Sequence, residues 1–406
     1  MPRLLDPQPR SPLSQAGLRK TSSTRSVSLP GYSSEVKDPC SFICVANVLV
    51  LEPWYQGSHR SWVEGWRSNS RHIIDVVNGS DSGWRRSLVT APTRFAEAIN
   101  EAPQPIDALV ASTPIDLATV LGLVDRSKRR PPTLLYMHES QIGYPPGPKG
   151  GQPYRAMIND WNAITSADRV AVATQFHADL LVEQMPDFAE GLIHGSGLKV
   201  KSILDKVNIL PVGVDTSGLR PISLDGPLRV LWNHRWSHDK NPGEFVHAVT
   251  ILAAEGYEFE LYALGEVERG GEKAFERLTS HLADRILLSG PQTYDAYRQV
   301  LCRSDLVLST AQHEFFGLAV AEAISAGARP LLPDRLAYPE ILPDGLSSQF
   351  LYRGSLEDSL RSTLAQPRDE VHRYRQETME YVSKFSWPTV APKYDSLVDE
   401  MLEATS

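Results

Sequence analysis

The stretch Ala311-Gln-His-Glu-Phe-Phe-Gly-Leu-Ala-Val-Ala-Glu-Ala-Ile-Ser-Ala-Gly327 directly follows an apolar run, Leu306–Ser309, that has the pattern of a short strand. Gly317 stands at the entry of a predicted helix that ends at the last glycine of the stretch. Because a helix N-terminus offers free amides and a positive dipole end, it suits an anionic ligand such as a diphosphate. Glu314 precedes this terminus, and Glu322 follows about two turns later. We therefore expect one carboxylate at the mouth of a ligand site and the other beside a ribose.

Outside this stretch, short apolar runs alternate with helical patterns. The strands predicted in the first half are Ala46–Leu51, Arg71–Val77, Ala108–Ala111, Thr133–Met137, Arg169–Val172 and Val207–Leu210. Those predicted in the second half are Leu228–Asn233, Phe259–Leu264, Ile286–Ser289, Leu306–Ser309 and Arg329–Leu332. Strands that alternate with helices imply parallel sheets with right-handed crossovers. The predicted fold class is α/β, with two Rossmann-like doubly wound domains that face each other across a cleft.

The length of 406 residues favours two domains. The expected parts are a disordered Ser/Pro/Arg-rich tail (1–42), two Rossmann-like domains (43–218 and 219–380) and a C-terminal helix (381–406) for which a return to the first domain is one option.

A net charge of −8 argues against general coating of nucleic acid, although a local basic patch remains compatible with it. No apolar run approaches the roughly 20 residues needed to cross a membrane, and three cysteines make no disulfide framework. We expect a cytoplasmic protein without a membrane partner.

Polar residues follow two of the predicted strands in the first half. Gly57 lets the backbone approach a ligand, and Ser58 can cap a helix or bind phosphate. An ordinary strand–turn–helix junction explains these two residues equally well. His138 and Glu139 follow the strand that begins at Thr133, where they can orient hydroxyl groups or serve a structural role.

The loop after the first strand of the second half carries two cations, Arg235 and Lys240. Both can neutralise a leaving diphosphate, although a solvated loop is the commoner place for such residues. Asn241 and Pro242 follow them as the predicted N-cap and first residue of a helix, with Glu244 completing a capping box. The sequence has no Asp-x-Asp pair to hold a divalent ion and no Gly-rich phosphate loop. Cationic side chains and helix amides must then replace a metal ion, and we expect no metal site and no cofactor.

Six segments together resemble the tRNA-queuosine mannosyltransferases, which belong to the retaining glycosyltransferases with two Rossmann-like domains, the GT-B architecture. The segments are Glu52–His59, His138–Pro145, His234–Pro242, Ser309–Gly317, Tyr338–Pro343 and Phe385–Trp387. The resemblance covers roughly residues 45–390. The chain departs from the family pattern at Gln56 and Ser140, where the family has Gly and Asn.

The resemblance implies a metal-independent, retaining transfer of mannose from GDP-mannose to the cyclopentene-diol of queuosine in tRNA. It implies that the first domain holds the acceptor and the second the nucleotide-sugar. The implied catalytic residues are His138, Glu314, Arg235 and Lys240. The implied donor-binding residues are Arg235, Lys240, Glu314, Gly317, Leu318 and Glu322, with the last of these on the ribose. The implied acceptor-side residues are Gly57, Ser58, His59, Glu139 and Gln141.

Binding of tRNA needs cations, and two basic clusters occur in the first half. They comprise Arg67, Arg71, Arg85 and Arg86, and Arg126, Lys128, Arg129 and Arg130. We expect Trp62, Trp66 or Trp84 to stack on an anticodon base, while an ordinary solvated face is the alternative for each cluster.

The competing functions are transfer to a lipid or small-metabolite acceptor from another nucleotide-sugar, a sugar-nucleotide phosphorylase or epimerase, and a non-catalytic binding module. The oligomeric state stays open.

Overall fold

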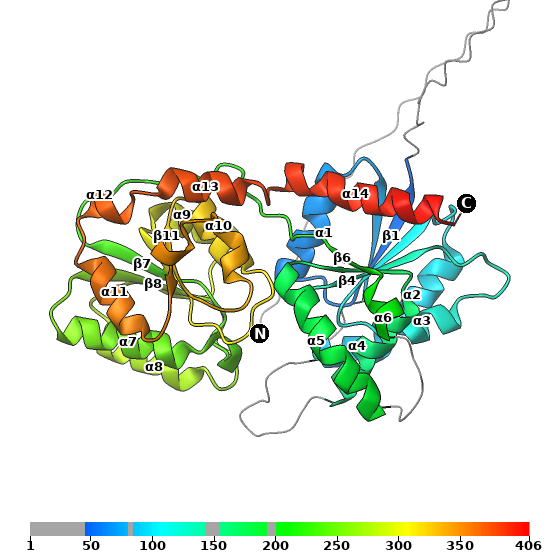
Figure 1. Cartoon of the computed structure of the whole chain (residues 1–406), viewed down its shortest axis with the longest axis horizontal. Helices are drawn as coiled ribbons and strands as arrows, with labels where there is room; N and C mark the ends of the chain where they lie inside the picture. The colour runs from blue at the N-terminus through cyan, green and yellow to red at the C-terminus, as the bar shows by residue number, and fades with distance from the viewer. Residues whose placement is uncertain (1–44, 80–83, 143–153, 193–199, 406) are drawn as a thin grey trace, which may run out of the picture. The chain divides into compact units, whose positions relative to one another are not determined.

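Six parallel strands form the first sheet in the order β2-β1-β3-β4-β5-β6 (Figure 1). The computed structural model describes residues 45–79, 84–142, 154–192 and 200–405, so the predicted tail lies outside the described residues. The strands are β1 (Asn47–Glu52), β2 (Ile73–Asn78), β3 (Ala108–Ser112), β4 (Thr133–Met137), β5 (Arg169–Val172) and β6 (Val207–Ile209). Every residue of β3 and β4 is buried, which is the pattern of a parallel sheet covered on both faces.

The second sheet is also parallel, in the order β12-β11-β10-β7-β8-β9. Its strands are β7 (Leu228–Trp232), β8 (Phe259–Leu264), β9 (Ile286–Gly290), β10 (Leu306–Leu308), β11 (Arg329–Pro333) and β12 (Leu351–Tyr352). The two sheets with their helices confirm the predicted fold class of two Rossmann-like units. The predicted strands all occur, with ends that shift by at most two residues. Only β12 was missed among the described strands, since two residues are too few to show a period.

Helices cover both faces of each sheet (Figure 1). Those of the first half are α1 (Gly57–Asn69), α2 (Trp84–Glu101), α3 (Leu117–Leu123), α4 (Tyr154–Ser166), α5 (Gln175–Leu192) and α6 (Val200–Leu204). Those that follow are α7 (Pro242–Ala254), α8 (Glu272–His281), α9 (Tyr294–Arg303), α10 (Leu318–Ser325), α11 (Leu356–Leu364), α12 (Arg368–Val371), α13 (Arg375–Ser383) and α14 (Trp387–Glu403). A buried cluster around Phe95, Leu109 and Leu135 joins α2–α5 to one face of the first sheet.

The last helix, α14, packs against α1 (Figure 1). The indole N–H of Trp62 donates to the Tyr394 hydroxyl (2.9 Å), and that of Trp66 donates to the Asp395 carboxylate (2.9 Å). Trp387 opens α14, and its ring lies so close to the backbone of Gly65 and Gly213 that a Cβ at either glycine would fall 2.0–2.2 Å from it. These two positions therefore need glycine for a close approach.

The predicted capping box at the start of α7 is wrong. Asn241 is the residue before the helix, but it has a left-handed conformation (φ 49°) and its side chain makes no capping bond to the backbone. Its amide instead donates to the Glu244 carboxylate (2.6 Å). The left-handed turn is tolerable because Asn adopts this region more readily than most residues.

Candidate active site

The chain order reverses once in each sheet, and the candidate residues follow the strands at these reversals. In the second sheet the reversal lies between β7 and β10, and in the first it lies between β1 and β3. Ligands of doubly wound sheets bind beyond the carboxyl ends of the strands at such points. The residues after β7 and β10 include Arg235, Lys240 and Glu314, while Glu52 ends β1 and Ser112 ends β3.

Glu314 is a partly buried carboxylate held between a lysine and the start of α10. Its Oε1 accepts the amides of Phe315, Phe316 and Gly317 at 3.1, 3.3 and 3.0 Å, and its Oε2 accepts from the Lys240 ammonium at 3.1 Å. Burial alone would raise its pKa, but the charge of Lys240 and these hydrogen bonds lower the pKa to about 2. The carboxylate is thus ionised at all ordinary pH values. The amide of Gly317 is engaged by Glu314, which differs from the expectation of free amides at this terminus.

The two cations of the β7 loop lie in an acidic setting. The Lys240 ammonium donates to the His313 carbonyl (2.8 Å) and lies 3.5 Å from the Asp239 carboxylate. Arg235 pairs with Glu268 (2.7 Å) and keeps about half of its side chain exposed. Both cations act by charge on Glu139 in the first half, opposing the burial that raises its pKa. Both can therefore reach an anion placed near the edge where β7 and β10 end.

Glu322 lies one turn into α10 and is partly buried, and its Oε2 accepts from the Tyr297 hydroxyl (2.7 Å). The Asn233 amide donates to the same hydroxyl (3.1 Å) and to the Ala319 carbonyl (2.8 Å). Burial raises the pKa of Glu322 to about 7, although the hydrogen bond from Tyr297 and the charge of Arg298 oppose it. Sequence reasoning missed Asn233 and Tyr297. A polar residue directly after a buried strand was the available signal for Asn233, whereas α9 gave none for Tyr297.

This shifted carboxyl gives a stability prediction. The folded pKa of Glu322, about 7, lies above its ordinary value of 4.5. The folded state therefore holds the proton more tightly than the unfolded state does. The stability that this proton provides is lost as pH rises through about 7. Glu322→Gln cannot ionise, so we expect it to raise Tm relative to the wild type at pH 8 and by clearly less at pH 5. Calorimetry at both pH values measures this. Glu276→Gln, at an exposed position of α8, is the control; an equal change at both pH values for Glu322→Gln would contradict the assignment.

Three predicted acceptor-side residues open α1. Gly57 adopts a positive φ of 51° as the first residue of the helix, and Gln56 is the residue before it. Ser58 therefore lies inside the first turn and does not cap the helix, so the capping interpretation is wrong. Both Gly57 and Ser58 are exposed. His59 follows with 17% of its side chain exposed.

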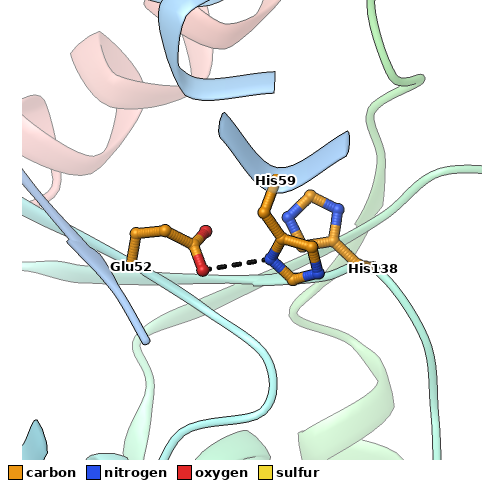
Figure 2. A group of neighbouring side chains, drawn as sticks. All are labelled: Glu52, His59 and His138. Carbon is orange, nitrogen blue, oxygen red and sulfur yellow. Dashed lines mark hydrogen bonds and ion pairs between the residues drawn. The ribbon is translucent and has the colours of Figure 1, made fainter. Parts of the chain in front are cut away.

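Glu52 and Ser112, which had no predicted role, fix His59 from the sheet. The Glu52 carboxylate is fully buried; its Oε1 accepts the Trp54 amide (2.8 Å) and lies 3.0 Å from the His59 Nδ1. The Ser112 hydroxyl donates to its Oε2 at 2.5 Å. Figure 2 shows the carboxylate directed at the His59 ring, with His138 behind it. A charged residue at the end of an apolar strand was the signal that could have identified Glu52.

His138, directly after β4, lies against this histidine, with ring centroids 4.1 Å apart and ring planes tilted by 46°. Its ring also contacts Trp62 and Tyr136, and its buried Nε2 has no hydrogen-bond partner among the described residues. Burial, together with the neighbouring His59, holds the pKa of His138 well below 6.5. It is therefore a neutral imidazole with one unused polar atom.

The other two predicted residues after β4 contact each other. The Gln141 side-chain amide donates to the Glu139 carboxylate (3.0 Å), and the Gln141 backbone amide donates to the buried Asp160 carboxylate (2.6 Å). Burial raises the pKa of Asp160 to about 8. The structure thus brings the predicted acceptor-side residues to one edge of the first sheet and the predicted donor residues to one edge of the second.

Comparisons with known proteins agree with this arrangement. Residues 47–214 match the family described as tRNA-queuosine alpha-mannosyltransferase N-terminal, and residues 222–378 match glycosyl transferases group 1. A tRNA-queuosine alpha-mannosyltransferase of Drosophila melanogaster is 27% identical over 321 residues, which are 73% of this chain and 82% of that protein. The chain thus resembles the tRNA-queuosine alpha-mannosyltransferases in its first half and the group 1 glycosyl transferases in its second. It is a glycosyltransferase.

Other relatives match about half of the chain or share its fold. A GDP-mannose:cellobiosyl-diphosphopolyprenol alpha-mannosyltransferase of Xanthomonas oryzae is 22% identical over 49% of the chain and 53% of that protein. Among solved structures, sucrose-phosphate synthase of Thermosynechococcus elongatus superposes with a TM-score of 0.71 at 13% identity, over 89% of the chain and 100% of that structure. The catalytic domain of Arabidopsis thaliana starch synthase IV gives 0.64 at 14% identity, over 89% and 100%. The fold is the GT-B architecture.

Three side chains in the first half of the chain have the composition of a metal site. Ligand atoms of Glu52, His59 and His138 lie within 4.8 Å of one another. However, two imidazoles on one tetrahedral zinc ion, with Zn–N bonds of about 2 Å, have ring centroids roughly 5 Å apart. The centroids of the two rings lie 4.1 Å apart, and Glu52 already bonds to the His59 Nδ1. The residues as placed fit a hydrogen-bonded pair with a neighbouring imidazole better than a chelating set.

The residues predicted to bind tRNA are mostly engaged within the protein. Trp62 and Trp66 are buried against α14, so the prediction that they stack on a base is wrong. Arg71 pairs with Asp399, and Arg67 lies 3.9 Å from Glu64. The side chains of Trp84 and Arg85 lie outside the described residues.

The second basic cluster precedes β4, at the edge of the sheet opposite to His138. Arg129 donates to the Thr405 carbonyl (2.7 Å) and Arg130 to the Ser166 carbonyl (2.6 Å). Lys128 donates to the carbonyl of Ile99 (3.4 Å). These contacts favour a structural role for the cluster over a role beside the reacting groups.

Proposed function

We propose that this glycosyltransferase transfers mannose from GDP-mannose to queuosine in tRNA with retention of the anomeric configuration. The observation that carries the proposal is the partly buried ion pair of Lys240 and Glu314, with Nζ 3.1 Å from Oε2, at the edge where β7 and β10 end. An ammonium fixed there can neutralise a leaving diphosphate, while a carboxylate that is always ionised can accept hydrogen bonds from sugar hydroxyls.

The choice of donor rests on relatives with different acceptors. The Drosophila relative and the two Xanthomonas relatives are all named as alpha-mannosyltransferases, and the names of the latter specify GDP-mannose. In this proposal Glu322 accepts hydrogen bonds from the ribose hydroxyls, and the Tyr297 hydroxyl, itself bonded to Asn233, orients the carboxylate. A shared donor is the simplest reason for the similarity to mannosyltransferases that act on different acceptors.

The choice of acceptor rests on the first half. Residues 47–214 are the part that matches a family described by its tRNA-queuosine substrate, and they contain the Glu52, His59 and His138 group. A tRNA substrate places the reaction in the cytoplasm. In the described residues no helix combines the length and apolar character that a membrane span requires.

The test is to combine the purified full chain with GDP-mannose and tRNA that carries queuosine, and to analyse the nucleosides by mass spectrometry. We expect one hexose added to queuosine in an alpha linkage, and the same nucleoside missing from cells that lack the gene. Tight binding of GDP-mannose with no transfer to queuosine would overturn the acceptor. Transfer from another nucleotide-sugar alone would overturn the donor.

Metal independence is a separate prediction. Because Lys240 and Arg235 stand where a divalent ion would otherwise neutralise the diphosphate, we expect the transfer rate to change less than about twofold in excess EDTA or with added Mn²⁺. Initial rates with dialysed enzyme measure this. A rate that falls with EDTA and returns with one particular metal ion would contradict it.

A lipid-linked acceptor is the second candidate, because the Xanthomonas relatives are named for a diphosphopolyprenol substrate. These relatives cover about half of the chain, whereas the Drosophila relative covers 73%. We therefore rank the lipid-linked acceptor second. Incubation with a diphosphopolyprenol-linked disaccharide distinguishes the two, since only this candidate gives a mannosylated lipid.

A further inference from the structure

The Glu52 carboxylate at the end of β1 and the His59 imidazole in the first turn of α1 are hydrogen-bonded to each other. Neither belongs to the predicted donor residues. Glu52 ends β1 at the reversal of strand order, and its carboxylate is buried. Three donors hold it: the Trp54 amide, the Ser112 hydroxyl and the His59 Nδ1. Burying a charge is costly unless it is paired, so a carboxylate with this many partners is fixed in position. The group it fixes is His59.

The Glu52 contact decides which nitrogen of His59 is available. When the ring is neutral, the proton shared with the carboxylate lies on Nδ1, and Nε2 keeps its lone pair. Among the described residues none hydrogen-bonds to this Nε2. The ring lies against the tilted ring of His138, with centroids 4.1 Å apart, and 17% of the side chain remains exposed. A base oriented by a third group in this manner is the general signature of proton abstraction.

We propose that Nε2 of His59 is the base that removes the proton from the attacking acceptor hydroxyl, and that Glu52, held by Ser112, is its positioning residue. The inference rests on the proposed function. In the transfer, the acceptor oxygen forms the new bond to the anomeric carbon, and the bond from that carbon to the diphosphate breaks. Both electrons of the broken bond leave with the phosphate oxygen, and the hydroxyl proton moves to Nε2.

The groups around His59 set the expected pH dependence. Burial lowers its pKa, but the charge and hydrogen bond of Glu52 and the charge of Glu139 prevail, so the net shift is upward from 6.5. His138, whose ring lies against that of His59, is neutral because burial holds its pKa well below 6.5. Since only the unprotonated ring can take a proton, the rate should rise with pH through the raised pKa of His59. Removing the charge of Glu52 should lower that pKa and move the acidic limb of the profile to lower pH.

The experiment measures kcat/KM for queuosine-containing tRNA between pH 5.5 and 9, with GDP-mannose binding measured in parallel. His59→Phe keeps a flat ring beside His138 but no nitrogen. We expect it to lower kcat/KM about 100-fold or more, to abolish the acidic limb, and to leave the affinity for GDP-mannose within about twofold. We expect Glu52→Gln to move the limb to lower pH. His281→Phe, at an exposed position of α8, is the control.

The outcomes separate this inference from the proposed function. Wild-type enzyme that transfers nothing to queuosine refutes the proposed function itself. Active wild-type enzyme with an acidic limb that survives in His59→Phe places the base elsewhere and overturns the inference. If Glu52→Gln lowers kcat/KM at every pH but leaves the acidic limb of the profile unmoved, Glu52 has a structural role. That result would overturn its assignment as the positioning residue. Circular dichroism and Tm of each variant exclude misfolding as the cause.

Discussion

Replacement of Lys240 by alanine is expected to lower kcat/KM about 100-fold or more, which corresponds to roughly 2–4 kcal/mol of transition-state stabilisation. The ammonium lies 3.1 Å from Glu314 and 2.8 Å from the His313 carbonyl, so it is fixed before any ligand binds. A fixed cation stabilises developing negative charge on a leaving diphosphate without reorganising during the reaction. Steady-state rates with varied GDP-mannose measure the loss, with kcat falling along with kcat/KM.

Two control variants make the Lys240 result specific. Lys273→Ala removes a lysine from an exposed position of α8 and should leave the rate unchanged. Lys240→Ala also leaves the Glu314 carboxylate without its cation. Because Glu314→Gln removes that unpaired charge, the double variant should recover stability but not activity. A Lys240→Ala enzyme with a rate near that of the wild type would remove Lys240 from the catalytic residues.

The sequence predicts the fold closely because each signal is local. An apolar run such as Thr133–Met137 between helical patterns already determines that a strand is buried on both faces, and its bounds agree with β4. By contrast, Leu351–Tyr352 is too short to show a period. The capping box at Asn241 failed for another reason, because the preceding turn forces a left-handed backbone from which the side chain cannot reach the helix amides.

The candidate site is predicted only as far as it depends on strand ends. Lys240 and Glu314 follow β7 and β10, and strand ends next to each other in a sheet bring such residues together. Tyr297 lies within α9, and its contact with Glu322 follows from tertiary packing alone. Trp62 was assigned to a base-stacking surface because the sequence does not indicate that α14 covers α1.

The largest stability effect is expected at Trp387, the first residue of α14. Its side chain is 5% exposed and lies against Gly65, Gly213 and Tyr394. Replacing a buried Trp by Ala typically costs about 3–5 kcal/mol, because the apolar contacts are lost and a cavity remains. We expect Trp387→Ala to lower the free energy of unfolding by this amount in urea or thermal denaturation. A change below about 1 kcal/mol would show that α14 does not depend on this contact.

Gly65→Ala tests the same contact from the other side. Alanine in the interior of α1 should gain up to about 1 kcal/mol in helix propensity, but its Cβ would lie 2.0 Å from the Trp387 Nε1. Overpacking of this kind costs about 1–3 kcal/mol, so the single variant should be destabilised. In the Trp387→Ala background the obstacle is gone, and Gly65→Ala should become stabilising. Gly122→Ala in α3, where an added Cβ meets nothing within 4 Å, should behave alike in both backgrounds. An unchanged sign for Gly65→Ala would mean that the ring of Trp387 does not lie against α1.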